Sequence, residues 1–403
     1  MTLALIVRKS LRQHALSTTV TALSIALAGG LLMSVWVVKE EAQRAFTDFT
    51  GGFDGVLGAR GSKLQLVLNA VFHLDESPGN LAWSDFVEVQ KNSNIEHAIP
   101  IAVGDNYRGY RLVGTVTNLF SQVEYAPGRR YGVRPPGRVF DPALREAVVG
   151  AVVAQRLGLK RGDIIHPFHG LAFDEEKEHA ETYLVVGILE PSNTPADRVI
   201  WIPLEGIQQM SGHDPKAATD ISAVLVKLKA GSAAAGFQMD VQHNKEASRL
   251  TFAWPIGRIV AQLFDKIGWF DKVLALVAYL VALVAAGSIL TSIYNSMNER
   301  RRDIAILRAL GAHRRTIFGA VVLEAVAIAS LGMIVAFVVY GVVVAAVAAV
   351  IRAQTGVVLS PLAFHAVMAW APAALIGMSA LAGVVPAFKA YRTNVAENLT
   401  PVS

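Results

Sequence analysis

The chain contains no cysteine among its 403 residues. This absence excludes disulfides, thiolate metal sites and a cysteine nucleophile, so any domain outside a membrane must be held by an ordinary hydrophobic core. Charged residues are also scarce, at 17% of the chain against about 25% in soluble proteins, whereas hydrophobic residues make up 53%. No basic run with interleaved aromatic residues is present, which argues against nucleic acid as a partner.

Four nearly uncharged stretches are long enough to cross a lipid bilayer, since about 20 helical residues cover its core of about 30 Å. We expect transmembrane helices at residues 16–38, 272–297, 317–351 and 362–388. The first is expected to be a permanent anchor, because it is longer than the apolar core of a signal peptide. Small-residue pairs within the spans, such as Gly29-Gly30, predict close contacts between helices.

Basic residues beside the spans predict their orientation. Three lie before the first span, six between the second and third, and two after the fourth, but the loop between the third and fourth has only Arg352. Basic residues favour the cytoplasmic side. This rule places in the cytoplasm an amphipathic N-terminus at residues 1–15, the segment 298–316 and the tail 389–403. Residues 39–271 and the loop 352–361 are then expected on the outer side.

The large outer segment, residues 39–271, predicts an α+β domain with its own core, in one or two lobes. Strand-like and helical runs alternate irregularly along it, which argues against a doubly wound fold. The expected strands are His97–Val103, Tyr110–Thr117, Ala147–Val153, Tyr183–Leu189, Val199–Pro203 and Ile221–Lys229, and the expected helices are Trp83–Lys91 and Leu204–Met210. The predicted fold is an α-helical membrane protein with four transmembrane helices and a large α+β domain inserted between helices 1 and 2.

Two further stretches of the outer segment have a characteristic composition. The glycine-rich residues 51–61 predict either a flexible connection or a tight packing surface. Residues Trp254–Trp269 are amphipathic, with a tryptophan at each end, which predicts a helix lying at the outer membrane interface.

The segment 298–316 places six arginines between two apolar stretches. An arginine at the centre of a membrane costs about 2.5–3.5 kcal/mol, so this segment must lie outside the hydrocarbon. Its apolar residues recur at helical spacing and are followed by Gly311, which predicts a short amphipathic helix. Such a helix has a face to press against a cytoplasmic partner. The alternative is an arginine-rich anchor that only fixes the orientation.

Residues Asn298–Ala312 read Asn-Glu-Arg-Arg-Arg-Asp-Ile-Ala-Ile-Leu-Arg-Ala-Leu-Gly-Ala. This motif resembles the cytoplasmic signature of the permease subunits of the MacB/FtsX superfamily of ABC transporters, the four-span type VII mechanotransmission family. The segments 323–325, 386–392 and 397–399 fit the same pattern, and in the outer segment residues 148–163, 185–191 and 201–205 are similar to family sequences. The resemblance implies a protein of the bacterial inner membrane with cytoplasmic termini and a periplasmic domain.

The resemblance also implies a mechanism. Two copies of the permease, a homodimer, would pair with cytoplasmic ABC ATPase subunits, whose ATP-driven closure moves the spans and the periplasmic domains. ATP and Mg are expected in the ATPase, and no catalytic or cofactor site is expected in this chain, which lacks the G-x-x-x-x-G-K-[ST] phosphate loop. The implied docking residues of the coupling helix are Glu299, Arg301, Arg302, Asp303, Ile306, Leu307, Arg308, Leu310 and Gly311.

Two outputs of such a permease stay open. One is export or extraction of a periplasmic or membrane substrate, with a periplasmic adaptor or substrate-binding protein as a further partner. The other is an FtsX-like regulatory permease, which activates a periplasmic cell-wall hydrolase and moves no cargo. The large outer domain favours the first by analogy with the family. The sequence does not name a substrate.

Two sets of ionisable residues remain. Glu324 falls within the third span, where an ionisable group is a functional candidate, but a packing role through an arginine or a second copy is favoured. His166, His169 and His179 lie among acidic residues, and imidazole with carboxylate suits a divalent metal. The charged run Asp174–Glu181 instead predicts a solvated hairpin tip, and we expect no metal site on this interpretation.

Overall fold

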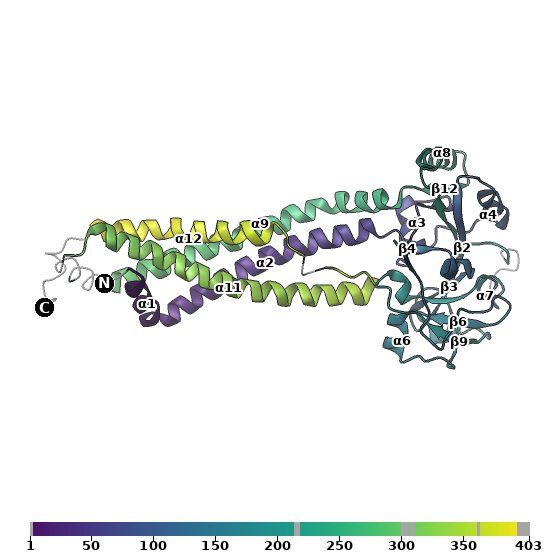
Figure 1. Cartoon of the computed structure of the whole chain (residues 1–403), viewed down its shortest axis with the longest axis horizontal. Coiled ribbons are helices and arrows are strands. Elements are labelled where there is room, and N and C mark those ends of the chain that lie inside the picture. The colour runs from purple at the N-terminus through teal and green to yellow at the C-terminus, as the bar shows by residue number, and fades with distance from the viewer. Residues whose placement is uncertain (1–2, 213–217, 300–305, 307–310, 361–362, 393–403) are drawn as a thin grey trace. The chain divides into compact units, whose positions relative to one another are not determined.

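The computed structural model describes residues 3–212, 218–299, 306, 311–360 and 363–392 (Figure 1). The chain divides into two compact units. One is a helical unit drawn from Met1–Glu41, Ile267–Ala348 and Ser360–Ser403, and the other is an α+β unit drawn from Ala42–Lys266 and Ala349–Leu359.

The long helices are α2 (Ala15–Asp48), α9 (Ile256–Glu299), α11 (Arg314–Thr355) and α12 (Val367–Arg392), preceded by the shorter α1 (Leu3–Gln13). Within the described residues, α2, α11 and α12 are each long and apolar enough to cross a membrane. Helix α9 adds a fourth span if its two parts, Ile256–Trp269 and Lys272–Ser288, are counted as one. The predicted helix Trp254–Trp269 corresponds to the first part of α9, which begins at Ile256, and its location at a membrane interface stays a prediction. The exact number of spans stays a prediction.

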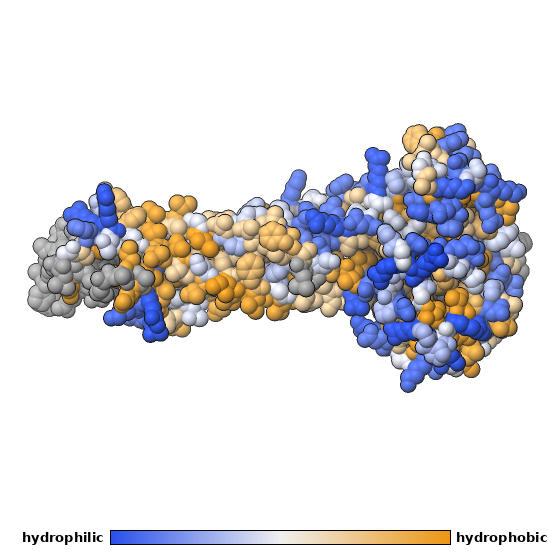
Figure 2. Space-filling model, in the orientation of Figure 1, coloured by the Kyte–Doolittle hydropathy of each residue, from blue (hydrophilic) through white to orange (hydrophobic). Residues whose placement is uncertain are grey.

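Small residues bring α2 and α11 together inside the helical unit. A Cβ atom on Gly30 would lie 2.7 Å from Cβ of Val339, and one on Gly29 would lie 2.8 Å from Sδ of Met333. The predicted contact through Gly29-Gly30 is thus confirmed. Elsewhere on the long helices apolar side chains face outward, and Figure 2 shows them gathered along the helix surfaces, as lipid contact requires.

The α+β unit is built on a mixed sheet whose strand order is β12-β1-β11-β2-β3-β10-β6-β9-β7, with β8 paired to β2. The strands are β1 (Gly55–Ala59), β2 (Ile95–Tyr107), β3 (Tyr110–Thr115), β6 (Glu146–Val149), β7 (Ile164–Ile165), β8 (Phe168–His169), β9 (Tyr183–Ile188), β10 (Ile200–Pro203), β11 (Ala223–Leu228) and β12 (Leu250–Ala253). A separate ribbon pairs β4 (Glu124–Ala126) with β5 (Arg129–Arg130).

Helices cover both faces of this sheet. They are α3 (Lys63–Ala70), α4 (Trp83–Gln90), α5 (Asn118–Ser121), α6 (Ala151–Leu157), α7 (Leu204–Gln208) and α8 (Ala233–His243), with 3-10 turns η1 (Glu175–Lys177) and η2 (Pro195–Arg198). Because side chains alternate across a strand, neighbours such as Val148 and Val149 enter different hydrophobic clusters. One cluster includes α3 and α5, and the other includes α4, α6 and α7. Both faces are therefore buried, which explains the continuous apolar runs of the central strands.

The predicted α+β architecture is confirmed for the unit drawn from Ala42–Lys266 and Ala349–Leu359, with two differences in detail. The expected strand Ala147–Val153 ends at Val149, and α6 begins at Ala151. Gly150 makes this change of direction possible, because a Cβ atom there would lie 2.3 Å from the carbonyl oxygen of Asp197. The glycine-rich residues 51–61 contain strand β1 and are a packing surface, since a Cβ on Gly58 would lie 2.3 Å from Cδ1 of Leu66.

Candidate functional sites

The predicted coupling helix lies almost entirely outside the described residues. Glu299 ends α9, and Ile306 is helical with 41% of its surface exposed. Gly311 has a φ of +97°, the left-handed conformation common just after a helix C-terminus. Outside the described residues lie Arg301, Arg302, Asp303, Leu307, Arg308 and Leu310. Their docking role stays a prediction.

Glu324 is buried within the helical unit, on α11. Its carboxylate accepts a hydrogen bond from Oγ of Ser10, on α1. This contact joins α1 to α11, which agrees with the packing role that the sequence favoured. The expected arginine or second copy as partner stays a prediction.

A second buried polar contact in the helical unit was not predicted from the sequence. His365 precedes α12 and its side chain is 1% exposed. Its Nδ1 lies 3.2 Å from Oε2 of Glu40 and its Nε2 lies 3.3 Å from Oε1 of Glu41, both on α2. The backbone N–H of Ser360 donates to Oε2 of Glu41 at 2.8 Å. Two carboxylates of α2 therefore hold the segment that leads into α12.

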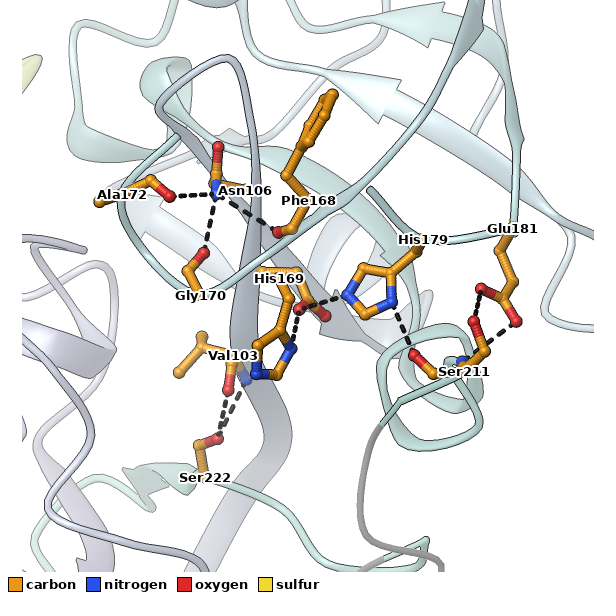
Figure 3. Close-up of polar contacts among 11 residues, drawn as sticks. Val103, Asn106, Phe168, His169, Gly170, Ala172, His179, Glu181, Ser211 and Ser222 are labelled. Carbon is orange, nitrogen blue, oxygen red and sulfur yellow. Dashed lines mark hydrogen bonds and ion pairs between the residues drawn. The ribbon is translucent and has the colours of Figure 1, made fainter. Parts of the chain in front are cut away.

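Two of the three candidate histidines, His169 and His179, lie close to the carboxylate of Asp105, which was not a candidate from the sequence. Asp105, His169 and His179 each offer one ligand atom, and these atoms lie within 4.8 Å of one another. Nε2 of His179 lies 3.1 Å, and Nδ1 of His169 lies 3.4 Å, from Oδ1 of Asp105 (Figure 3). Among the residues that the structure describes, this group alone has the composition and spacing of a metal site.

Backbone pairing explains why these residues meet. Strand β8 is antiparallel to β2, and its register places His169 opposite Asp105. Side chains at directly opposed positions lie on the same face of a sheet, close enough to interact. His179 lies after η1, where its backbone N–H donates to the carbonyl oxygen of Pro167 at 2.9 Å. The meeting therefore depends on contacts between strands and loops that are distant in the sequence.

The third predicted histidine lies elsewhere. Nδ1 of His166 is 3.2 Å from Oε1 of Glu178, and both side chains are about half exposed, at 49%. The charged run Asp174–Glu181 predicted a solvated hairpin tip. This prediction is correct for η1, none of whose residues is buried. It is wrong for His179 and Glu181, which are 7% and 9% exposed, because their partners lie on other segments.

A cavity of about 650 Å³ borders the cluster, and His169 is part of its wall. Other lining residues are His73, Arg111 and Arg198. Burial, with the positive charge of Arg111, lowers the pKa of His73 to about 3, so this imidazole is neutral at pH 7. Burial also lowers the pKa of the Arg111 guanidinium, which nonetheless stays charged. The cavity wall thus combines charged side chains of both signs, Asp75 and Glu76 among them, with a neutral imidazole and with His169 of the cluster.

Comparisons with known proteins include a match by sequence. Residues 275–395 match the family described as FtsX-like permease C-terminal. No curated protein matches the chain significantly.

Two solved structures resemble parts of the chain. The extracellular domain of the noncanonic ABC-type transporter YknZ from Gram-positive bacteria is 15% identical, with a TM-score of 0.30 over 49% of this chain and 97% of that one. The periplasmic region of MacB from Actinobacillus actinomycetemcomitans is 12% identical, with a TM-score of 0.33 over 53% of this chain and 94% of that one.

Proposed function

We propose a function on the premise that this chain belongs, through residues 275–395, to the FtsX-like permease family. The chain is the membrane subunit of an ABC transporter, and ATP is hydrolysed by a separate cytoplasmic subunit that docks on residues 298–316. The family match carries the proposal, because it extends over helices α9, α11 and α12 and includes the arginine-rich segment between them.

In this proposal, movement of the spans is transmitted to the α+β unit. Continuity of the helices supports it. Helix α2 begins in the helical unit, but Phe46 in its last turn and Phe49 just after its end pack against the core of the α+β unit. The first turns of α9 enter the same core through Ile259 and Phe264. An unbroken helix is a stiff element, so in this proposal a displacement of α2 is passed along it to that core.

The remaining parts of the proposal concern partners and output. Two copies of the chain form the permease, the α+β unit lies in the periplasm, and a periplasmic adaptor or substrate-binding protein assists. The output is export or extraction of a periplasmic or membrane substrate. An FtsX-like regulatory permease would couple to the ATPase in the same way and would differ only in activating a cell-wall hydrolase.

The test is copurification of the full-length chain with candidate ABC ATPase subunits from the same organism, followed by ATP hydrolysis of the complex in lipid. Arg302→Glu reverses a charge on the proposed docking helix and should abolish both association and stimulated hydrolysis. Arg12→Glu is the matched control, since it makes the same reversal on the exposed side of α1, also predicted to be cytoplasmic. Copurification that Arg302→Glu leaves unaltered, or the absence of any complex with wild type, would refute the proposal.

A further inference from the structure

We propose that Asp105, His169 and His179 form a binding site for one divalent transition-metal ion of the zinc class. The inference concerns the α+β unit alone and does not rest on the proposed permease function. The cluster offers two imidazoles and one carboxylate, each able to supply one bond to the metal. Three protein ligands of this kind, with a remaining position for water or another ligand, are typical of open zinc sites.

The spacing of the ligand atoms agrees with such a site. Zinc binds imidazole nitrogen and carboxylate oxygen at about 2.0–2.1 Å, so two ligands of a tetrahedral site lie roughly 3.3–3.4 Å apart. The two nitrogens lie 3.1 and 3.4 Å from Oδ1 of Asp105, and all three ligand atoms lie within 4.8 Å of one another. Small movements of side chains already in place would complete the coordination.

The tautomer of His179 also favours a cation. Its Nδ1 lies 2.6 Å from the carbonyl oxygen of Ser211, which can only accept, so Nδ1 carries a hydrogen. In the neutral imidazole, Nε2 then presents a lone pair to Oδ1 of Asp105 at 3.1 Å. Two lone pairs repel at this distance, and a metal ion between them replaces the repulsion by two bonds. The competing interpretation is a doubly protonated His179 that donates to Asp105 without any metal.

Outer contacts hold the ligands in place, as is usual around metal sites. The carbonyl that accepts from His179 belongs to Ser211, whose N–H and Oγ donate to Glu181 at 3.1 and 2.8 Å (Figure 3). On the other side, the amide of Asn106 donates to the carbonyl oxygens of Phe168, Gly170 and Ala172 at 3.3, 2.8 and 3.1 Å. The two amide hydrogens share these three acceptors and so fix the loop that carries His169. The site is therefore preorganised rather than formed by mobile surface side chains.

Burial and access both suit a bound ion. The side chains of Asp105 and His179 are 0% and 5% exposed, whereas His169 is 52% exposed and borders the cavity of about 650 Å³. An ion can thus reach the site past His169. Two nitrogen ligands favour zinc and the late first-row metals over magnesium or calcium, which prefer oxygen.

Zinc binding to the full-length, untagged protein in detergent tests the proposal. The apoprotein is prepared with a chelator and titrated with Zn²⁺ against a chromophoric competitor. We expect one ion per chain. Co²⁺ used as a spectroscopic substitute should give visible absorption bands of an imidazole-containing site. No cysteine thiolate competes for either metal, because the chain has none.

Three variants separate the proposal from its alternatives. His169→Ala, at a half-exposed position with little risk to folding, should weaken zinc binding by about 100-fold or more, beyond the ~10–100-fold that loss of an outer contact causes. Asp105→Asn keeps the shape of the side chain and should weaken binding similarly. His166→Ala removes a neighbouring histidine outside the cluster and should retain wild-type affinity. Absence of saturable binding, or wild-type affinity in His169→Ala, would overturn the proposal.

Discussion

Replacing Asp197 by alanine should destabilise the loop between β9 and β10. Asp197 is 1% exposed, and its carboxylate accepts from the N–H of Ser192 at 3.0 and 3.1 Å, from Oγ of Ser192 at 2.7 Å and from the N–H of Asn193 at 2.8 Å. A buried donor left without an acceptor costs about 1–3 kcal/mol. Two of the three donors belong to buried Ser192, whereas Asn193 is exposed. Hydrogen bonds to a charged group contribute about 1.5–3 kcal/mol each, so the two buried ones at the low end give about 3 kcal/mol, or roughly a 150-fold change in the local opening equilibrium.

Hydrogen exchange of the full-length protein, read on peptides covering residues 192–203, measures this opening directly. Asp197→Ala should accelerate exchange there by about two orders of magnitude. Asp197→Asn keeps one acceptor oxygen and should have roughly half the free-energy effect. Asp174→Ala is the matched control, because Asp174 accepts a single bond from Glu176 and its side chain is 42% exposed. Exchange that changes less than about threefold in Asp197→Ala would refute the reasoning.

Two further predictions concern the same unit. Gly150→Ala should lower the free energy of unfolding by about 1–3 kcal/mol, because the added Cβ would lie 2.3 Å from the backbone oxygen of Asp197. Hydrogen exchange in α6 at the wild-type rate would contradict this. The hydrogen bonds from Arg138 hold the pKa of Glu146 below its usual value, so the pair stabilises the fold at neutral pH and loses this effect as pH falls through that lowered pKa. Arg138→Gln should therefore lower the thermal unfolding temperature at pH 7. The difference in unfolding temperature between variant and wild type should shrink below about pH 4. A difference that is the same at every pH would show that the ion pair is not its cause.

Much of the fold could be predicted because it depends on patterns within one segment. Helices α2, α11 and α12 cover predicted spans, since more than twenty apolar residues without charge have few other stable environments. The strands β2, β3, β9, β10 and β11 were predicted from their apolar and β-branched runs. The resemblance to FtsX-like permeases was confirmed by residues 275–395.

Two features of the α+β unit were not predicted, because the local sequence is not typical of the structure that it forms. Strand β1 is rich in glycine, which normally disfavours a strand, and it is stable only because β11 and β12 pair with it on both sides. The end of β6 at Val149 could not be located either, because Ala151–Val153 is as apolar as the strand before it. In both places tertiary contacts outweighed local propensity.

The sequence by itself indicated the membrane character and the α+β unit. It named His169 and His179, with His166, as candidate ligands but led us to expect no metal site. Only the tertiary structure brought Asp105 to His169 and His179, and only it directed His166 toward Glu178 instead. The same holds for His365 with Glu40 and Glu41, which come from opposite ends of the chain. Apolar periodicity is visible within a single segment, whereas a polar cluster depends on strand register and on which loops meet, and these are fixed by contacts between residues far apart in the chain.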